Sequence, residues 1–415
     1  MRAQEEHHRA VVKALLLENI HPLGTEVLDA AGMEVSTRSG ALDEDELIAA
    51  LDGVQVLGIR SKTHITAKVL EQAKDLVAIG AFCIGTNQID LTAAADAGVV
   101  AFNAPFSNTR SVVELALAEI IALTRRLTEK DKSLHAGTWD KSANGAHEVR
   151  GRTLGIVGYG NIGTQLSVVA EALGMRVIFY DTAEKLSLGN AKRMPSLHAL
   201  LAEADMVTLH VDGRPGNAGM FGADEFAAMK PGAIFLNLSR GFLVDYGALR
   251  EQVLAGRVSG AAVDVFPQEP KKQGDAFDSE LRNLPNVILT PHVGGSTEEA
   301  QQDIGRFVAA KLRDYVHSGA TALSVNVPAL ILDRPRAGTR RIAHLHQNVP
   351  GVMAAANQEL SAAGANIESQ VLATSGSLGY AVTDISGDLP VETLTRIEGM
   401  EATVRLRTLR PDSDD

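Results

Sequence analysis

Short apolar runs alternate with amphipathic stretches from Val12 to about Asn103. The runs at 14–19 and 56–61 have the character of buried strands, and the stretch 43–53 has helical spacing. Strands that alternate with helices favour a parallel sheet with crossover helices. A long apolar segment of helical period, 111–127, follows this block, so we expect an α/β layer and then a helix.

A second alternating block lies between residues 154 and 292. It contains six strand candidates: LGIVGYG, RVIFYD, MVTLHV, AIFLNLS, GAAVDVF and NVILTPH. Helical patterns separate several of them, and six such strands are typical of the doubly wound dinucleotide-binding fold. A long helical pattern at 298–316 follows the last strand.

The pattern changes again near the C-terminus. The segment 328–341, with two prolines and four arginines, is interpreted as a linker. Beyond it the order is strand, helix, strand, strand, helix, strand, which predicts a ferredoxin-like βαββαβ unit. The polar or charged ends, MRAQEEHHRA and RPDSDD, are predicted to be frayed tails.

Composition narrows the class of protein. With 415 residues the chain is too long for one core, and its formal net charge of -12 argues against a nucleic-acid partner. Cys83 is the single cysteine, so no disulfide forms within the chain. We find no secretory signal and no apolar run long enough to span a membrane, and we expect a cytoplasmic protein without a metal site.

The sequence Gly158-x-Gly160-x-x-Gly163 stands between a strand pattern and a helical pattern. Gly158 would allow a tight turn, Gly160 would let a pyrophosphate approach, and Gly163 would let helix and sheet pack closely. Asp181 closes the next strand and would accept hydrogen bonds from the adenosine ribose, which favours NAD over NADP. The alternative to a cofactor site is an ordinary glycine-rich turn, with Asp181 as a solvated strand end. The cofactor prediction also includes the residues that begin the helix, Asn161 and Ile162.

Three later strand patterns end in unusual polar segments, which carry Arg240, Glu269 and His292. Ligands bind at the carboxyl ends of strands in such sheets, so the three side chains should converge. Arg240 suits a substrate carboxylate, because its fork is bidentate and permanently charged. His292 suits a general base, and Glu269 would orient it and raise its basicity. Each residue alone also has an ordinary reading as a surface charge or a structural histidine.

The ordered motifs GxGxxG, Asp, SRG, DVFxxEP and TPHxGG resemble the D-isomer-specific 2-hydroxyacid dehydrogenases. The resemblance implies that Arg240, Glu269 and His292 are catalytic and that Leu238 and Asp264 adjoin the cofactor. It also implies a Rossmann NAD domain at 108–296 inserted in a flavodoxin-like substrate domain at 1–107 and 297–329. Gly294 and Gly295 would then lie at a hinge, and 338–415 would be an ACT regulatory domain.

Within this family, the segments 59–66, 81–91 and 102–111 are similar to those of members that oxidise 3-phospho-D-glycerate to 3-phosphooxypyruvate with NAD, which opens L-serine biosynthesis. Arg60 and Lys62 end a strand pattern two residues apart, so they should face one side and hold the phosphate. Their ordinary reading is surface charge. Lys62 stands where close relatives carry Arg. Further substrate contacts implied by the resemblance are Ser61, Asn108 and, from a neighbouring subunit, Lys141.

The segments 340–352 and 364–369 resemble the serine-site segments of ACT domains. This resemblance implies L-serine as an effector, bound by His346, Asn348 and Asn366, with Asn366 from the partner subunit of a homotetramer. Ala337-Gly338 stands where the family carries a Gly-Gly linker. The alternative is that the unit only assists assembly.

Two other functions remain open from the sequence. One is a hydroxypyruvate or glyoxylate reductase, although such enzymes lack the ACT domain. The other is an NAD-binding corepressor that acts as a scaffold, since such proteins can retain all three catalytic residues.

Overall fold

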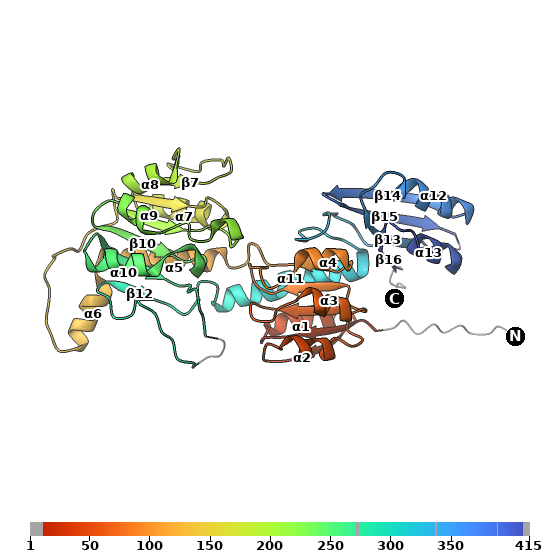
Figure 1. Cartoon of the computed structure of the whole chain (residues 1–415), viewed down its shortest axis with the longest axis horizontal. Helices are drawn as coiled ribbons and strands as arrows, with labels where there is room; N and C mark the ends of the chain where they lie inside the picture. Colours follow the sequence, from red (N-terminus) through yellow and green to blue (C-terminus); the bar gives the residue numbers. More distant parts are fainter. Residues whose placement is uncertain (1–10, 271–273, 337, 388, 410–415) are drawn as a thin grey trace. The chain divides into compact units, whose positions relative to one another are not determined.

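A computed structural model describes residues 11–270, 274–336, 338–387 and 389–409 (Figure 1). The chain divides into two units, Met1–Pro105 with Gln301–Asp415, and Phe106–Ala300. The two tails predicted to fray, and Ala337 of the linker, lie outside the described residues. The domain boundaries that the sequence predicts stay predictions.

The N-terminal part of the first unit is a five-stranded parallel sheet in the order β2-β1-β3-β4-β5, the flavodoxin-like order. The strands are β1 (Lys13–Leu16), β2 (Glu34–Thr37), β3 (Val56–Ile59), β4 (Ala78–Ala81) and β5 (Val100–Phe102). The helices are α1 (Pro22–Asp29), α2 (Glu44–Ala50), α3 (Ala67–Gln72) and α4 (Leu91–Asp96). The flavodoxin-like expectation is thereby confirmed.

Helix α11 (Glu298–Ser318) packs on this sheet through residues of the same unit. Gly80 in β4 is what allows the close approach. A Cβ at this position would lie 2.7 Å from Val308 and 2.8 Å from Leu312, and both of these side chains are fully buried. The predicted helix 298–316 is therefore confirmed, and its apolar face completes the core of the sheet.

The C-terminal part has the predicted βαββαβ order. Its antiparallel sheet runs β14-β15-β13-β16, with strands β13 (Arg340–Gln347), β14 (Asn366–Ser375), β15 (Leu378–Ser386) and β16 (Thr403–Leu409). Its helices are α12 (Val352–Ala362) and α13 (Val391–Glu398). This antiparallel sheet agrees with an ACT domain.

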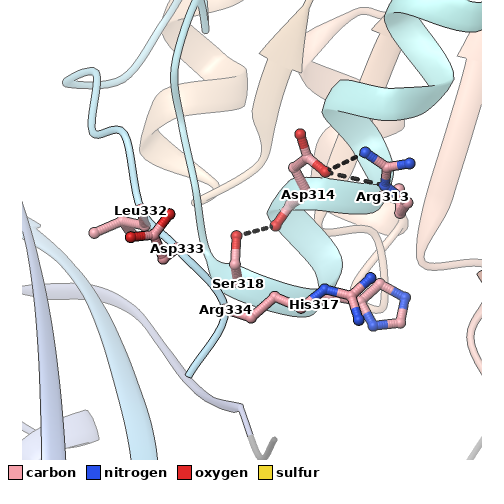
Figure 2. A pocket seen from close by; sticks show the side chains of 7 residues that line it. All are labelled: Arg313, Asp314, His317, Ser318, Leu332, Asp333 and Arg334. Atoms are coloured by element: carbon pink, nitrogen blue, oxygen red, sulfur yellow. Dashed lines mark hydrogen bonds and ion pairs between the residues drawn. The ribbon is translucent and has the colours of Figure 1, made fainter. Parts of the chain in front are cut away.

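A buried arginine joins the ACT domain to the end of α11. Arg341 pairs with Asp384 at 2.6 Å, and its Nη1 also donates to the carbonyls of Ser318 and Asp333. Ser318 and Asp333 help line a surface pocket, which Figure 2 shows. There the carboxylate of Asp314 pairs with Arg313, and the Asp314 carbonyl accepts from the Ser318 hydroxyl. Arg341 thus fixes both the helix end and the chain that leads to β13.

The second unit is a seven-stranded parallel sheet in the order β12-β11-β10-β9-β6-β7-β8, which confirms the doubly wound fold. Its strands are β6 (Thr153–Val157), β7 (Arg176–Tyr180), β8 (Lys192–Arg193), β9 (Met206–Leu209), β10 (Ala233–Asn237), β11 (Val258–Val263) and β12 (Val287–Leu289). Its helices are α5 (Thr109–Thr124), α6 (Leu127–His135), α7 (Asn161–Ala172), α8 (Leu197–Glu203), α9 (Ala223–Ala228) and α10 (Tyr246–Leu254), with 3-10 turns η1 (Pro215–Asn217) and η2 (Gly241–Leu243). The six predicted strands are present, and β8 is an added edge strand of two charged residues.

The helix predicted over 111–127 is wrong at its C-terminal end. Helix α5 stops at Thr124, Arg126 adopts a left-handed φ of 53°, and α6 starts at Leu127. The N–H of His147 donates to the Thr124 carbonyl at 2.8 Å and so satisfies a group in the last turn of α5. Figure 1 shows α6 on an arm that extends from its unit. Within the described ranges, no helix combines the length and apolar character needed to cross a membrane.

Candidate active site

The glycine motif occupies the turn between β6 and α7, and each glycine has a steric reason. Gly158 has a φ of 92°, and a Cβ there would lie 2.5 Å from the His210 carbonyl oxygen. A Cβ at Gly163 would lie 2.3 Å from the carbonyl oxygen of Gly158. A Cβ at Gly160 would meet no heavy atom within 4 Å. The first and third glycines therefore serve packing, and the second leaves open space where a pyrophosphate could approach the backbone.

The start of α7 fits a dinucleotide phosphate. Gly160 is the N-cap and supplies no side-chain hydrogen bond, so the N–H groups of the first turn, which contains Asn161 and Ile162, are not capped by it. Backbone N–H groups and the helix dipole at such an end favour an anion. These residues would hold the pyrophosphate of NAD.

Asp181 follows β7 and is half-buried. Its carboxylate accepts from the N–H of Tyr159 and from the N–H of Ala183, both at 2.8 Å. A carboxylate has about four acceptor positions, so two of them remain for the ribose hydroxyls of NAD. Asp181 therefore fixes the glycine turn, and its contact with the adenosine ribose stays a prediction.

The catalytic candidates come from three successive strand ends, after β10, β11 and β12. His292 Nδ1 lies 2.9 Å from Oε2 and 3.1 Å from Oε1 of Glu269. The N–H of Phe266 donates to Oε1 of Glu269 at 3.1 Å, which fixes that carboxylate. Because Nδ1 faces the carboxylate, Nε2 of His292 is the ring nitrogen that can serve a substrate.

The pair shifts the acid–base properties of both partners. The hydrogen bond that His292 donates to Glu269 raises the pKa of His292 above its ordinary value, against the opposing effect of burial. Burial raises the pKa of Glu269, but the hydrogen bond and the charge of His292 bring it below its ordinary value. His292 is thus a stronger base than a free imidazole.

Asp264 shapes the segment that carries His292. This carboxylate is 1% exposed and accepts from the Thr290 hydroxyl at 2.6 Å and from the N–H groups of Val293 and Gly294, both at 2.8 Å. His292 itself has a left-handed φ of 55°. Burial raises the pKa of Asp264. The bonds of Asp264 hold the turn in which His292 adopts its uncommon backbone conformation.

Arg240 stands directly after β10 and is half-buried. Its carbonyl accepts from Asn237 Nδ2 at 3.0 Å, and its Nη1 donates to the Ser239 carbonyl at 2.7 Å. A Cβ at Gly213 would lie 3.2 Å from Nε of Arg240, so the guanidinium stem lies against a bare backbone. The predicted cofactor residue Leu238, 7% exposed, is part of the core beside it.

The predicted substrate residues lie on both units. Arg60, Ser61 and Lys62 follow β3, with Ser61 and Lys62 exposed and Arg60 half-buried. Asn108 is the N-cap of α5, and its amide lies so close to Gly295 that a Cβ on that glycine would be 2.4 Å from Nδ2. Lys141 is exposed in the segment after α6, near Trp139, which is 79% exposed. The contacts of these residues with a substrate stay predictions.

The predicted effector residues lie in the ACT domain. Asn348 follows β13, and its Nδ2 donates to the Gly376 carbonyl at 3.3 Å, whereas Asn366 begins β14 and donates to Glu368 at 2.8 Å. One chain therefore places Asn348 and Asn366 at opposite ends of the ten-residue strand β14, about 30 Å apart at 3.3 Å per residue. His346 is 2% exposed, and its Nε2 is buried without a hydrogen-bond partner.

Sequence reasoning missed His210, which follows β9 at the same edge of the sheet. Nε2 of His210 lies 3.0 Å from the Thr208 hydroxyl, and burial lowers its pKa to about 4. It is therefore neutral near pH 7, with its backbone carbonyl against Gly158. The predicted strand MVTLHV contains this histidine as its next-to-last residue, but the strand pattern alone does not distinguish it from an ordinary strand residue.

Residues 117–294 match the family model described as "D-isomer specific 2-hydroxyacid dehydrogenase, NAD binding domain". Among solved structures, the chain is similar to a D-lactate dehydrogenase from Aquifex aeolicus complexed with NAD and lactic acid, at 25% identity and a TM-score of 0.65, over 73% of this chain and 95% of that one. It is also similar to a D-2-hydroxyisocaproate dehydrogenase, at 25% identity and a TM-score of 0.68, over 76% and 100%. The chain therefore carries an NAD-binding domain of this kind.

Curated relatives align over almost their whole length. A D-3-phosphoglycerate dehydrogenase of Haemophilus influenzae is 46% identical over 97% of this chain and 98% of the relative. The enzymes of that name from Escherichia coli and Dictyostelium discoideum are 47% and 44% identical, each over 96% of this chain and 97% of the relative. The alignments extend past the substrate and NAD domains into the ACT domain. The chain belongs to the D-3-phosphoglycerate dehydrogenases, within the D-isomer-specific 2-hydroxyacid dehydrogenase family.

Proposed function

We propose that the chain oxidises 3-phospho-D-glycerate to 3-phosphooxypyruvate with NAD, the first step of L-serine biosynthesis. The observation that carries this proposal is the 2.9 Å contact of His292 with Glu269, which makes a general base at the end of the NAD-binding sheet. The choice of substrate is supported by relatives named D-3-phosphoglycerate dehydrogenase, which are 44–47% identical over nearly the whole chain.

The chemistry divides among the three catalytic residues. Arg240 holds the substrate carboxylate and polarises the C2–O bond. Nε2 of His292 removes the proton of the C2 hydroxyl, and Glu269 stabilises the imidazolium that forms. NAD, when bound, accepts the hydride that leaves C2. The substrate thus loses one hydride and one proton, and the proton passes from His292 to solvent.

The phosphate is proposed to bind Arg60 and Lys62, with Ser61, Asn108 and a neighbouring subunit's Lys141 as further substrate contacts. Two cations two residues apart on an exposed loop suit a dianion, because charge-assisted hydrogen bonds to phosphate are strong. A substrate without a phosphate does not need such a pair, which favours 3-phosphoglycerate over glyoxylate or hydroxypyruvate.

The test is a steady-state assay with NAD and 3-phosphoglycerate, for the wild type and His292→Ala. We expect turnover in the wild type and a loss of about a hundredfold or more in kcat for the variant. His198→Ala, an exposed histidine on α8, is the matched control and should keep wild-type turnover. Absence of turnover in the wild type with NAD bound would favour a scaffold, and preference for unphosphorylated glycerate would favour a reductase of the same family.

We further propose that L-serine inhibits the enzyme by binding at the ACT domain, that the enzyme is a cytoplasmic homotetramer, and that Asn366 of one chain meets Asn348 of another. The separation of these two residues along β14 supports a site shared between subunits. The single cysteine and the biosynthetic role support a location in the cytoplasm.

A further inference from the structure

Glu18 is a buried carboxylate next to the loop that carries Arg60 and Lys62. It follows β1 and is 8% exposed, with a left-handed φ of 64°. β1 and β3 are parallel neighbours, with Leu16 opposite Gly58. The segments that leave the two strands therefore emerge at the same edge of the sheet, and Glu18 faces the loop after β3.

The carboxylate of Glu18 accepts three backbone hydrogen bonds from that loop. Oε1 accepts from the N–H of Thr63 at 2.9 Å and of Arg60 at 3.2 Å, and Oε2 accepts from the N–H of Lys62 at 3.0 Å. Three of four consecutive N–H groups thus converge on one anion, and such bonds to a charged acceptor are stronger than neutral ones. They fix the backbone from which the side chains of Arg60 and Lys62 project.

A second buried side chain, that of Gln88, binds the backbone carbonyl of Arg60. Gln88 is 3% exposed, and its Nε2 donates to the Arg60 carbonyl at 2.6 Å and to the Gly85 carbonyl at 3.3 Å. The N–H of Arg60 is therefore bound by Glu18 and its carbonyl by Gln88. The backbone at Arg60 is restrained on both sides before any ligand arrives.

We propose that Glu18 is a positioning residue, which sets the geometry in which Arg60 and Lys62 bind the substrate phosphate. The inference rests on the proposed function, because that proposal assigns Arg60 and Lys62 to the substrate phosphate. The negative charge of Glu18 also offsets the mutual repulsion of the two cations, so the loop is preorganised for a dianion. Glu18 acts through the loop backbone and has no role in proton or hydride transfer.

The experiment compares Glu18→Gln with wild type on two substrates, 3-phosphoglycerate and unphosphorylated D-glycerate. The amide has the size of the carboxylate but lacks its charge. Its NH2 group is a donor, so it cannot accept the backbone N–H groups that one of the carboxylate oxygens accepts. We expect the KM for 3-phosphoglycerate to rise about ten- to hundredfold, as for loss of charge-assisted hydrogen bonds. The KM for D-glycerate, kcat and the Kd for NAD should change less than about threefold, since the reacting groups are untouched.

The controls separate positioning from general destabilisation. Glu26 is an exposed glutamate on α1, the helix that follows β1. Glu26→Gln should leave both KM values unchanged. In the Arg60→Ala background, Glu18→Gln should add little further loss, because both changes act on one loop. If Glu18→Gln does not fold, Glu18→Asp, which keeps the charge with a shorter reach, takes its place in the same comparison.

The outcomes distinguish this proposal from the one on which it rests. The positioning role alone would be overturned if a folded Glu18 variant showed the same rise in KM for both substrates, or no rise for either. The positioning role would also be overturned if the rise in KM for 3-phosphoglycerate in the double variant equalled the product of the rises in Glu18→Gln and Arg60→Ala. A wild type that does not turn over 3-phosphoglycerate would overturn the proposed function and, with it, this role of Glu18.

Discussion

Nδ1 of His292 lies 2.9 Å from Oε2 of Glu269, at the ends of two neighbouring parallel strands, β12 and β11. The contact fixes the ring orientation and leaves Nε2 for the substrate. It also raises the pKa of His292, since the adjacent carboxylate favours the imidazolium. The base strength of the site is thus a property of the pair.

Glu269→Gln should lower the pKa of His292 and move the pH profile. Oxidation needs a neutral His292, so kcat/KM rises with pH through the His292 pKa, and this limb should move to lower pH in the variant. In the reverse direction, which needs the imidazolium, the falling limb should move to lower pH as well. Both profiles are measured from pH 5 to 9, with the exposed Glu251→Gln on α10 as control. An unmoved limb would show that Glu269 does not tune the base.

Two glycines of the NAD turn, Gly160 and Gly163, should respond differently to alanine. Gly163→Ala brings a Cβ to 2.3 Å from the Gly158 carbonyl, so we expect a large loss of stability, several kcal/mol. Gly160→Ala meets no protein atom within 4 Å and should fold normally, yet bind NAD at least about tenfold more weakly. Thermal melts and NADH fluorescence titrations separate the two effects. Normal NAD affinity in Gly160→Ala would remove this glycine from the pyrophosphate site.

Asp181→Asn should improve the relative use of NADP. The carboxylate repels a 2′-phosphate, whereas the amide is neutral and can still accept from the N–H of Tyr159. The asparagine variant therefore tests charge without deleting the hydrogen bond that fixes the turn, which an alanine would do. We expect the ratio of kcat/KM for NAD over NADP to fall about tenfold or more. A constant ratio would mean that Asp181 serves the turn only.

Much of the fold follows from periodicity, because buried parallel strands are near-continuous apolar runs. The strand patterns, the βαββαβ unit and the glycine motif all carry this signal. The end of α5 does not, since the residues around Arg126 are good helix formers and the break depends on a distant donor, His147. β8 has two charged residues and is defined only by its neighbour β7.

The candidate site was predictable where strand ends carry unusual polar residues, as at Arg240, Glu269 and His292. His210 and Glu18 also follow strands, but a histidine or glutamate in that position has no sequence signal that separates it from an ordinary surface residue. Their importance comes from burial and from partners far apart in the chain, such as Glu18 with Thr63. Such pairings are set by tertiary structure.

Breaking the buried ion pair of Arg341 with Asp384 should destabilise the ACT domain strongly. The two side chains are only 5% and 10% exposed, so Asp384→Asn leaves a buried guanidinium partly unpaired and should cost about 3–5 kcal/mol. The exposed pair of Glu359 with Arg396 gives the control, since Glu359→Gln should cost less than about 1 kcal/mol. Hydrogen exchange of the β13 and β15 amides measures both.

The same pair gives a pH dependence of known sign. Burial raises the pKa of Asp384, but its bonds with Arg341 bring it below the ordinary value of 3.8. A carboxyl with a lowered folded pKa stabilises the fold above its unfolded pKa, and the stabilisation is lost as pH falls through the folded value. The difference between wild type and Asp384→Asn should thus be full at pH 6 and shrink below about pH 4. A difference that grows in acid would contradict the ion pair.

Serine inhibition should depend on two different subunits. Asn348 and Asn366 lie at opposite ends of β14 in one chain, so one serine can contact both only when they belong to different chains. We expect millimolar serine to inhibit the wild type, and Asn348→Ala or Asn366→Ala alone to abolish most of this inhibition. Loss of charge-assisted or buried hydrogen bonds of this kind weakens binding about tenfold or more.

Mixed oligomers decide whether the site is shared. When Asn348→Ala and Asn366→Ala chains are co-expressed, a pair of unlike subunits contains one site with both asparagines intact and one site with both replaced. Part of the serine inhibition should therefore return in the mixture, although neither parent shows it. If each chain bound serine with its own residues only, every site in the mixture would still lack one asparagine, and no inhibition would return. Full activity of the wild type in millimolar serine would mean that the ACT domain does not sense serine.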